Sequence, residues 1–210
     1  MMPITVIEGI AAPLLRDNID TDVIIPSRDI TSPSRDGLGE RAFAPWRYLQ
    51  GGSEENPDFV LNRAPWRGAS ILIAGANFGC GSSREMAVWA LAQLGLRCIV
   101  APSFGAIFRN NCVRNALLPV ELSREVVDSL AKLANSHALP LTIDLAASEL
   151  RGPSGLCHRF TLPDDDREML LSGLDAIDRT WQWREAIESF EAMDRVKRPW
   201  AWPHKICEPG

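Results

Sequence analysis

The sequence lacks any long apolar run. The longest largely apolar stretch, Ala69 to Ala76, is far shorter than the roughly 20 residues that cross a bilayer. The first residues, MMPITVIEGI, carry no basic segment of the kind that begins a secretory signal. We therefore expect a cytoplasmic protein that makes no membrane contact.

The sequence also lacks closely spaced cysteines. Five cysteines stand alone, at positions 80, 98, 112, 157 and 207. An odd number of separated cysteines fits a reducing compartment better than a disulfide framework. An iron-sulfur cluster needs three or four convergent thiolates, usually a few residues apart in sequence. The three histidines, at 137, 158 and 204, share no ligand spacing either. We expect no metal or cofactor on this chain, and any cluster that the activity needs must belong to a partner.

Lysine is scarce, with three residues in the whole chain, at 132, 197 and 205. Acidic residues outnumber basic ones by 27 to 22, and almost all of the basic residues are arginines. This balance argues against a nucleic-acid-binding surface. A chain of 210 residues is long enough to bury a core and short enough for one compact domain.

Residues 69–101 form the most regular stretch of the sequence. ASILIA predicts a strand, GANFGCGSS a glycine-rich turn, REMAVWALAQLG a buried helix and LRCIVA a second strand. Hydrophobic periodicity and turn residues predict the other elements: strands at 4–7, 117–120, 139–145 and 158–162, and helices at 104–111, 123–135, 164–172 and 182–195. The alternation indicates an α/β domain over residues 1–195.

Residues 196–210, VKRPWAWPHKICEPG, predict an irregular C-terminal tail because prolines interrupt any helix. Trp200 and Trp202 would be exposed there unless something covers them. Docking against a partner and folding back on the domain both remain open.

The segment GCGSSRE, residues 79–85, has two interpretations. If Ser82 is a helix N-cap, Glu85 falls three residues later and completes a capping box. That interpretation leaves Arg84 unexplained, because the positive end of a helix dipole favours anions over cations. An arginine beside free backbone N–H groups and glycines is typical of a carboxylate or phosphate site. Both interpretations stay open at this point.

Three ordered motifs carry a family resemblance. NIDTDVIIP at 18–26, NFGCGSSRE at 77–85 and APSFGAIFRNN at 101–111 together resemble the aconitase superfamily. The chain length and PDFVLN at 57–62 narrow the resemblance to the small subunits of isopropylmalate dehydratase. The resemblance implies a single swivelling domain of β/β/α type and a large partner subunit, in a heterodimer or higher heteromer, that carries a 4Fe-4S cluster.

The same resemblance implies roles for five residues. Ser82 is implied as the general base, and Ser83 as a substrate contact. Arg84 is implied to bind a substrate carboxylate, while Thr21 and Asp22 line the active site and Asp22 orients a catalytic group of the partner.

The resemblance implies that the loop around Arg35 to Gly39 chooses among substrate side chains, and we predict that the longer loop from Arg28 to Gly39 sets this choice. Ile30 and Leu38 are its apolar members, and Arg35 between them could hold the loop over a substrate carboxylate. Substrate contact and ordinary packing beneath a surface loop are both possible for the two apolar residues.

The resemblance implies a hydro-lyase that isomerises 2-isopropylmalate and 3-isopropylmalate in leucine biosynthesis, active only with its large subunit on a small dicarboxylate hydroxy acid. Where the family motif continues SSREHA, this chain reads SSREMA, with Met86 in place of histidine. Met86 indicates either repacking of the core or a relative acting on another 2-alkylmalate, of citraconate or dimethylmalate type. A third interpretation is a non-catalytic binding module, since some aconitase relatives bind RNA. The excess of acidic over basic residues argues against RNA binding.

Overall fold

The computed structural model describes residues 2–30, 35–49 and 52–202. Contacts within the chain divide it into two units, Met1–Gly173 and Leu174–Gly210, which are described separately. None of the helices in the described ranges is long and apolar enough to cross a membrane.

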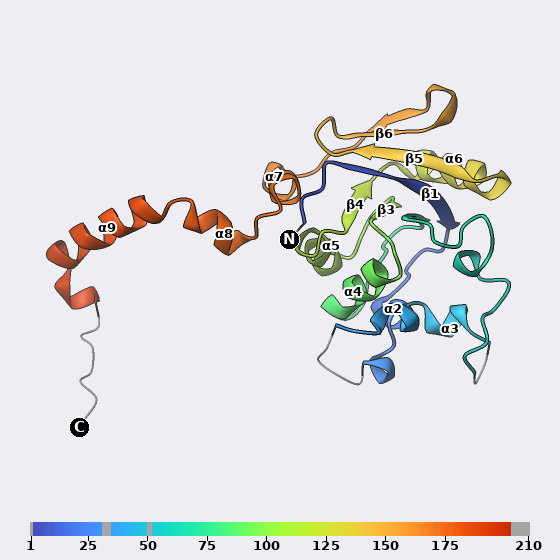
Figure 1. Ribbon diagram of the computed structural model, residues 1–210, viewed down its shortest axis with the longest axis horizontal. Helices are drawn as coiled ribbons and strands as arrows, with labels where there is room; N and C mark the ends of the chain where they lie inside the picture. Colours follow the sequence, from blue (N-terminus) through green and yellow to red (C-terminus); the bar gives the residue numbers. More distant parts are fainter. Residues whose placement is uncertain (1, 31–34, 50–51, 203–210) are drawn as a thin grey trace. The chain divides into compact units, whose positions relative to one another are not determined.

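The first unit is built on one mixed sheet (Figure 1). Its strands lie in the order β4-β3-β2-β1-β5-β6-β7. The pairs among β1 to β4 are parallel, and β5 to β7 continue the sheet antiparallel on the other side of β1. Their bounds are Val6–Leu14 (β1), Ile71–Ala74 (β2), Cys98–Ala101 (β3), Leu118–Glu121 (β4), Leu139–Asp144 (β5), Glu149–Arg151 (β6) and Cys157–Arg159 (β7).

Helices cover both faces of the sheet. Their bounds in this unit are Thr21–Ile24 (α1), Leu38–Arg41 (α2), Ala44–Arg47 (α3), Glu85–Gln93 (α4), Ala106–Arg114 (α5), Arg124–Ser136 (α6) and Asp164–Ser172 (α7). Short 3-10 turns lie at Ser27–Asp29, Val60–Asn62 and Pro153–Gly155. Every residue of β2 and β3 is buried, as expected for parallel strands that helices cover on both sides.

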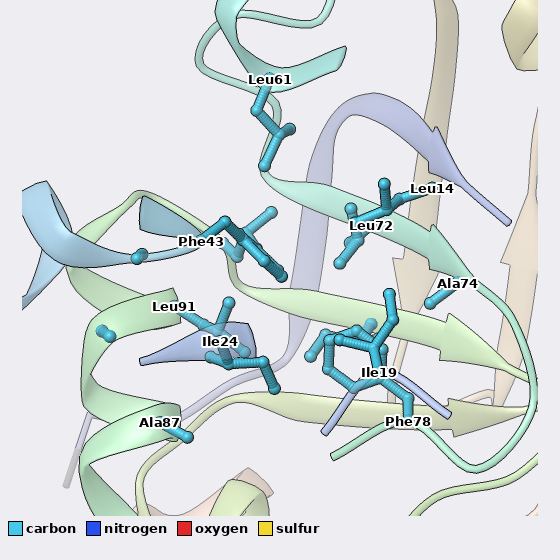
Figure 2. Packing of buried hydrophobic residues seen from close by; sticks show 14 of the residues in the cluster. Leu14, Ile19, Ile24, Phe43, Leu61, Leu72, Ala74, Phe78, Ala87 and Leu91 are labelled. Atoms are coloured by element: carbon cyan, nitrogen blue, oxygen red, sulfur yellow. The ribbon is translucent and has the colours of Figure 1, made fainter. Parts of the chain in front are cut away.

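Two hydrophobic cores lie on the two faces. Successive strand residues point to opposite faces, so Leu72 and Ala74 of β2 enter one core while Ile71 and Ile73 enter the other. In the first core, Leu72 and Ala74 lie among side chains from α1, α4 and the segments around them, including Leu91 (Figure 2). The second core packs the sheet against α6 and α7. The first core is the one that underlies the candidate site.

The sequence-based elements of this unit are largely confirmed. β2, α4 and β3 form the predicted strand-turn-helix-strand unit, and α5, β4, α7 and β5 lie where they were expected. Ser123 caps α6 as predicted, because its side chain accepts from the Val126 N–H at 3.5 Å. The strand β6 was not predicted, and β7 begins one residue before its expected start and ends three residues early.

The second unit contains α8, Ala176–Trp181, α9, Arg184–Lys197, and a 3-10 turn at Pro199–Ala201. α9 confirms the helix expected at 182–195. The predicted irregular tail is wrong over its first residues, because α9 continues to Lys197 and the turn follows it. The contacts divide the chain after Gly173, whereas the sequence suggested residue 195. Residues 203–210 lie outside the described ranges.

The described tryptophans of the tail differ from each other. The Trp202 indole N–H donates to Asp194 Oδ2 at 3.1 Å, and Arg195 lies over the Trp202 ring at 4.5 Å. Trp202 therefore folds back on α9 of its own unit. Trp200 is 79% exposed.

Candidate active site

The segments that follow β1 and β2 lie side by side at the carboxyl edge of the parallel strands. The Gly79 N–H donates to the Ile19 carbonyl at 2.7 Å, and the Thr21 N–H donates to the Cys80 carbonyl at 3.0 Å. Parallel strands end at the same edge of a sheet, which is where α/β proteins bind ligands. The first two motifs are thus brought together by the sheet itself.

The third motif joins them through Phe78. Its N–H donates to the Ser103 carbonyl at 3.1 Å, and its carbonyl accepts from the Gly105 N–H at 2.9 Å. Gly79 has a positive φ of 72°, and a Cβ there would lie 2.1 Å from the Phe108 ring. Only glycine fits at this crossing, because both the backbone conformation and the space exclude a side chain.

Thr21 fixes the position of Ser82. α1 begins at Thr21, and Asp20 caps it by accepting from the Val23 N–H at 2.8 Å. The Thr21 side chain is 1% exposed, and its hydroxyl donates to the Ser82 carbonyl at 3.0 Å. A bond between residues 61 positions apart therefore holds the serine turn against α1.

Arg84 and Asp22 form an ion pair. Arg84 Nη1 lies 2.5 Å from Asp22 Oδ1 and 3.3 Å from the Ile25 carbonyl. The guanidinium holds the pKa of Asp22 below its usual value, with a further contribution from the Ser27 hydroxyl at 3.0 Å. Because this pKa is lowered, the pair stays charged through the neutral range and is lost only on strong acidification. Within the described ranges, Arg84 Nε and Nη2 have no partner.

Ser82 and Ser83 are exposed beside this pair. Neither hydroxyl has a hydrogen-bond partner among the residues that the structure describes. The Arg84 N–H donates to the Ser82 carbonyl at 2.8 Å, which closes the turn directly before α4. Two unengaged hydroxyls therefore stand next to a guanidinium that has two free donor groups.

The capping-box interpretation of Ser82 and Glu85 is wrong. α4 begins at Glu85, and its N-cap position is held by Arg84 in an extended conformation without a side-chain cap. Glu85 Oε1 instead accepts from Asn115 Nδ2 at 2.8 Å. Asn115 Oδ1 also accepts from the Trp89 indole N–H at 2.8 Å, so this amide ties α4 to the end of α5. No local sequence pattern marks Asn115 for this role.

The segment at Arg35 to Gly39 is held by α4. The Arg35 guanidinium lies over the Trp89 ring at 4.2 Å, and the Gln93 amide donates to the Arg35 carbonyl. The Gly39 N–H donates to Gln93 Oε1 at 3.1 Å. Gln93 was not singled out from the sequence, but it fixes this segment on the helix that starts next to Arg84.

The apolar members of the loop take part in packing. Leu38 is 5% exposed within the first core, and Ile30 is partly buried against that core. Met86 is also partly buried there, which favours the packing interpretation of this residue. Residues 31–34 of the loop lie outside the described ranges, and contact of the loop with a substrate stays a prediction.

Leu38→Ala is expected to lower the free energy of unfolding by about 2 to 4 kcal/mol, because it removes buried methyl groups from a packed core. Chemical denaturation of the isolated chain measures this. Leu49→Ala, at an exposed leucine, is the control and should change stability by less than about 0.5 kcal/mol. A loss below about 1 kcal/mol at Leu38 would show that its packing is dispensable and would favour a direct role in substrate contact.

The four cysteines in the described part of the chain belong to no group that could hold a metal ion. Burial raises the pKa of the Cys98 and Cys112 thiols, and burial together with Asp20 raises the pKa of Cys80. Within the described ranges, no three His, Cys, Asp or Glu residues are placed to hold a metal ion.

At neutral pH, iodoacetamide is expected to modify Cys157 several-fold faster than Cys80. Cys157 is exposed, whereas the raised pKa of Cys80 keeps its thiol protonated and poorly nucleophilic. Peptide mapping by mass spectrometry after timed alkylation gives the two rates. Faster labelling of Cys80 would indicate a reactive thiolate in the serine turn.

Comparison with known proteins places these motifs in a family. Residues 1–125 match the family described as "Aconitase C-terminal domain". The chain is 54% identical over 204 residues to the 3-isopropylmalate dehydratase small subunit of Cupriavidus necator, covering 95% of this chain and 98% of the relative. It is 49% identical to the protein of the same name from Afipia carboxidovorans, covering 95% and 100%.

A solved structure has the same fold. The crystal structure of 3-isopropylmalate dehydratase from Methanocaldococcus jannaschii aligns with a TM-score of 0.61 at 24% identity. The alignment covers 89% of this chain and 99% of that one. The mixed sheet covered by helices is therefore the swivelling-domain fold that the motifs predicted.

Proposed function

The chain belongs to the 3-isopropylmalate dehydratase small subunits of the aconitase superfamily, and from this membership we propose that it is the small subunit of a hydro-lyase in leucine biosynthesis. The reaction isomerises 2-isopropylmalate and 3-isopropylmalate by dehydration and rehydration. The observation that carries the proposal is the near-complete match, at 54% identity, to a protein of that name. Relatives of this kind favour neither another alkylmalate nor an RNA-binding role.

Arg84 binds a substrate carboxylate in this proposal. Removal of a proton next to a carboxylate builds negative charge on that carboxylate, so a fixed cation acts where charge develops. Arg84 is 17% exposed and anchored through Nη1 to Asp22, which leaves Nε and Nη2 as a pair of donors. Such a pair matches the two oxygens of a carboxylate.

Ser82 is the proposed base, and Ser83 contributes further substrate contacts. A serine hydroxyl is too weakly acidic to be an alkoxide near neutral pH without help. The neighbouring Arg84 guanidinium and the backbone N–H groups that open α4 supply positive potential at this turn. Thr21 holds the serine turn in place through the Ser82 carbonyl.

The remaining parts of the site come from the partner. A 4Fe-4S cluster on the large subunit would supply a Lewis acid for the departing hydroxide. We assign the cluster to the partner because the described part of this chain gathers no ligand set for it. The Asp22 side chain is 56% exposed, and its bonds to Arg84 and Ser27 all end on Oδ1, so it can orient a group of the partner while it holds Arg84.

The loop that carries Arg35, Ile30 and Leu38 is proposed to contact the substrate's alkyl group and so to select among substrates. Both carboxylates and the hydroxyl are common to all malate-type substrates, so discrimination needs a surface that contacts the alkyl group. Gln93 and Trp89 fix Arg35 on the helix that starts beside Arg84, which places loop and carboxylate site on one rigid element. The four cysteines in the described ranges are unpaired, which supports a cytoplasmic location.

Reconstitution tests the proposed function. The purified chain alone should not isomerise 2-isopropylmalate, and activity should appear on mixing with a cluster-loaded large subunit from the same genome. Citramalate, with a smaller alkyl group, serves as the matched substrate and should be converted at least tenfold less efficiently. Turnover by the isolated chain would contradict the two-subunit proposal. A preference for citramalate would contradict the assignment of 2-isopropylmalate as the substrate.

A further inference from the structure

Trp89 connects the loop that carries Arg35 to the end of α5. The Arg35 guanidinium lies over one face of the Trp89 ring, 4.2 Å from the ring centre. The indole N–H donates to Asn115 Oδ1 at 2.8 Å, directly after α5. The Trp89 side chain is half-buried, whereas Arg35 is exposed. The indole therefore has a fixed bond at its edge and an exposed cation on its face.

The Asn115 amide is held in one orientation. Its Nδ2 group donates to Glu85 Oε1 at 2.8 Å and to the Asn111 carbonyl at 2.9 Å. Its Oδ1 atom accepts from the indole N–H. A flipped amide would place its oxygen against two acceptors and its N–H groups against a donor. Asn115 therefore fixes the edge of the indole between the start of α4 and the end of α5.

Arg35 is held by α4 at two separate points. The Gln93 amide donates to the Arg35 carbonyl, and the Trp89 ring carries the guanidinium. Trp89 and Gln93 are four residues apart, so they lie on the same face of the helix. Gln93 fixes only the main chain, and the long side chain of an exposed arginine would still sample many rotamers. The Trp89 ring selects among them, because a cation is attracted to the face of an indole.

We propose that Trp89, fixed by Asn115, is a positioning residue for substrate selection, an inference that rests on the proposed function. The indole sets where the Arg35 guanidinium lies, and with it the loop that is proposed to contact the alkyl group. Trp89 and Asn115 act through Arg35 and make no contact with the substrate themselves. Their effect should therefore fall on the choice between substrates and not on the proton transfer.

Trp89→Phe tests this role in the reconstituted enzyme. Phenylalanine keeps an aromatic ring but has no N–H to donate to Asn115. We expect KM for 2-isopropylmalate to rise roughly fivefold, the usual effect of one lost hydrogen bond. The kcat and the KM for citramalate should stay within about twofold, because the proposed base and carboxylate site are unchanged.

Trp46→Phe is the matched control. Trp46 is also half-buried and also carries an arginine, Arg16, at 4.5 Å from its ring centre. It belongs to α3 and does not contact Arg35. Trp46→Phe should leave the preference between the two substrates within about twofold.

Arg35→Gln separates positioning from general support of the fold. If Trp89 acts through Arg35, Trp89→Phe should change the substrate preference by less than about twofold once Arg35→Gln is present. A structural role would give the same roughly fivefold effect with and without Arg35 and would overturn the inference. An unchanged preference of the single Trp89→Phe variant would overturn it as well.

Asn115→Asp tests the same role with the Trp89 ring intact. The new carboxylate has the shape of the amide but faces the Glu85 carboxylate, and repulsion should move it away from the indole. We expect the same loss of preference, and Glu85→Gln in the same chain should restore most of it, because the glutamine amide donates to the new carboxylate. An unchanged preference, or a loss without this rescue, would exclude Asn115 from the role. Failure of the wild-type enzyme to convert 2-isopropylmalate would instead overturn the proposed function, and this inference with it.

Discussion

Ser82→Ala is expected to lower kcat of the reconstituted enzyme by a factor of about 10² to 10⁴, the usual contribution of a positioned general base. The Ser82 hydroxyl is exposed and has no partner among the described residues, so its loss should change the free energy of unfolding by less than about 0.5 kcal/mol. Assembly with the large subunit should be unchanged, because the backbone bond from Thr21 remains.

Ser83→Ala is the matched control for this prediction. It removes the same hydroxyl from the next residue, which is equally exposed. As a substrate contact, Ser83 should affect KM more than kcat. Stopped-flow measurement of single turnovers separates the proton-transfer step from product release. A Ser82→Ala enzyme within tenfold of the wild-type rate would remove Ser82 as the base.

Arg84→Lys is expected to reduce kcat/KM by a factor of about 10² or more. Lysine keeps the charge, but its ammonium lacks the planar fork of the guanidinium. Arg84 donates to Asp22 through Nη1 and still presents Nε and Nη2 side by side to two carboxylate oxygens, which an ammonium cannot do. Because the carboxylate gains charge in the transition state, kcat should fall together with a rise in KM.

Arg97→Lys, the same exchange at an exposed arginine beyond the opposite end of α4, should leave the kinetics within twofold. Steady-state assays of both variants in the reconstituted enzyme make the comparison. Unchanged kinetics of Arg84→Lys would place Arg84 outside the substrate site and leave its pair with Asp22 as a purely structural contact.

The parts of the fold that follow from local patterns could be predicted from the sequence. Residues 69–101 carry a complete strand-turn-helix-strand pattern, and β2, α4 and β3 confirm it. The strand β6 was missed because its three residues, Glu149 to Arg151, are too few to show an alternation. The division of the chain's contacts after Gly173 is a property of tertiary contacts, which local sequence patterns do not describe.

For the candidate site, the sequence allowed prediction of the motifs but not of the contacts that each residue makes. The pattern S-x-x-E at 82–85 suggested a cap, but the helix starts at Glu85, and the extended conformation of Arg84 accompanies a bond to Asp22, 62 positions away. Gln93 and Asn115 were missed for the same reason, because their partners are distant in sequence. Local patterns locate motifs, and tertiary contacts decide what each residue in them does.

The most direct test of the account is a structure of the reconstituted enzyme with 2-isopropylmalate bound. The account predicts that a substrate carboxylate accepts from Arg84 Nε and Nη2, with Asp22 still on Nη1. It also predicts that Ser82 Oγ lies about 3 to 3.5 Å from the carbon that loses its proton. A substrate bound without contact to Arg84, with the Ser82 hydroxyl facing solvent, would contradict the account.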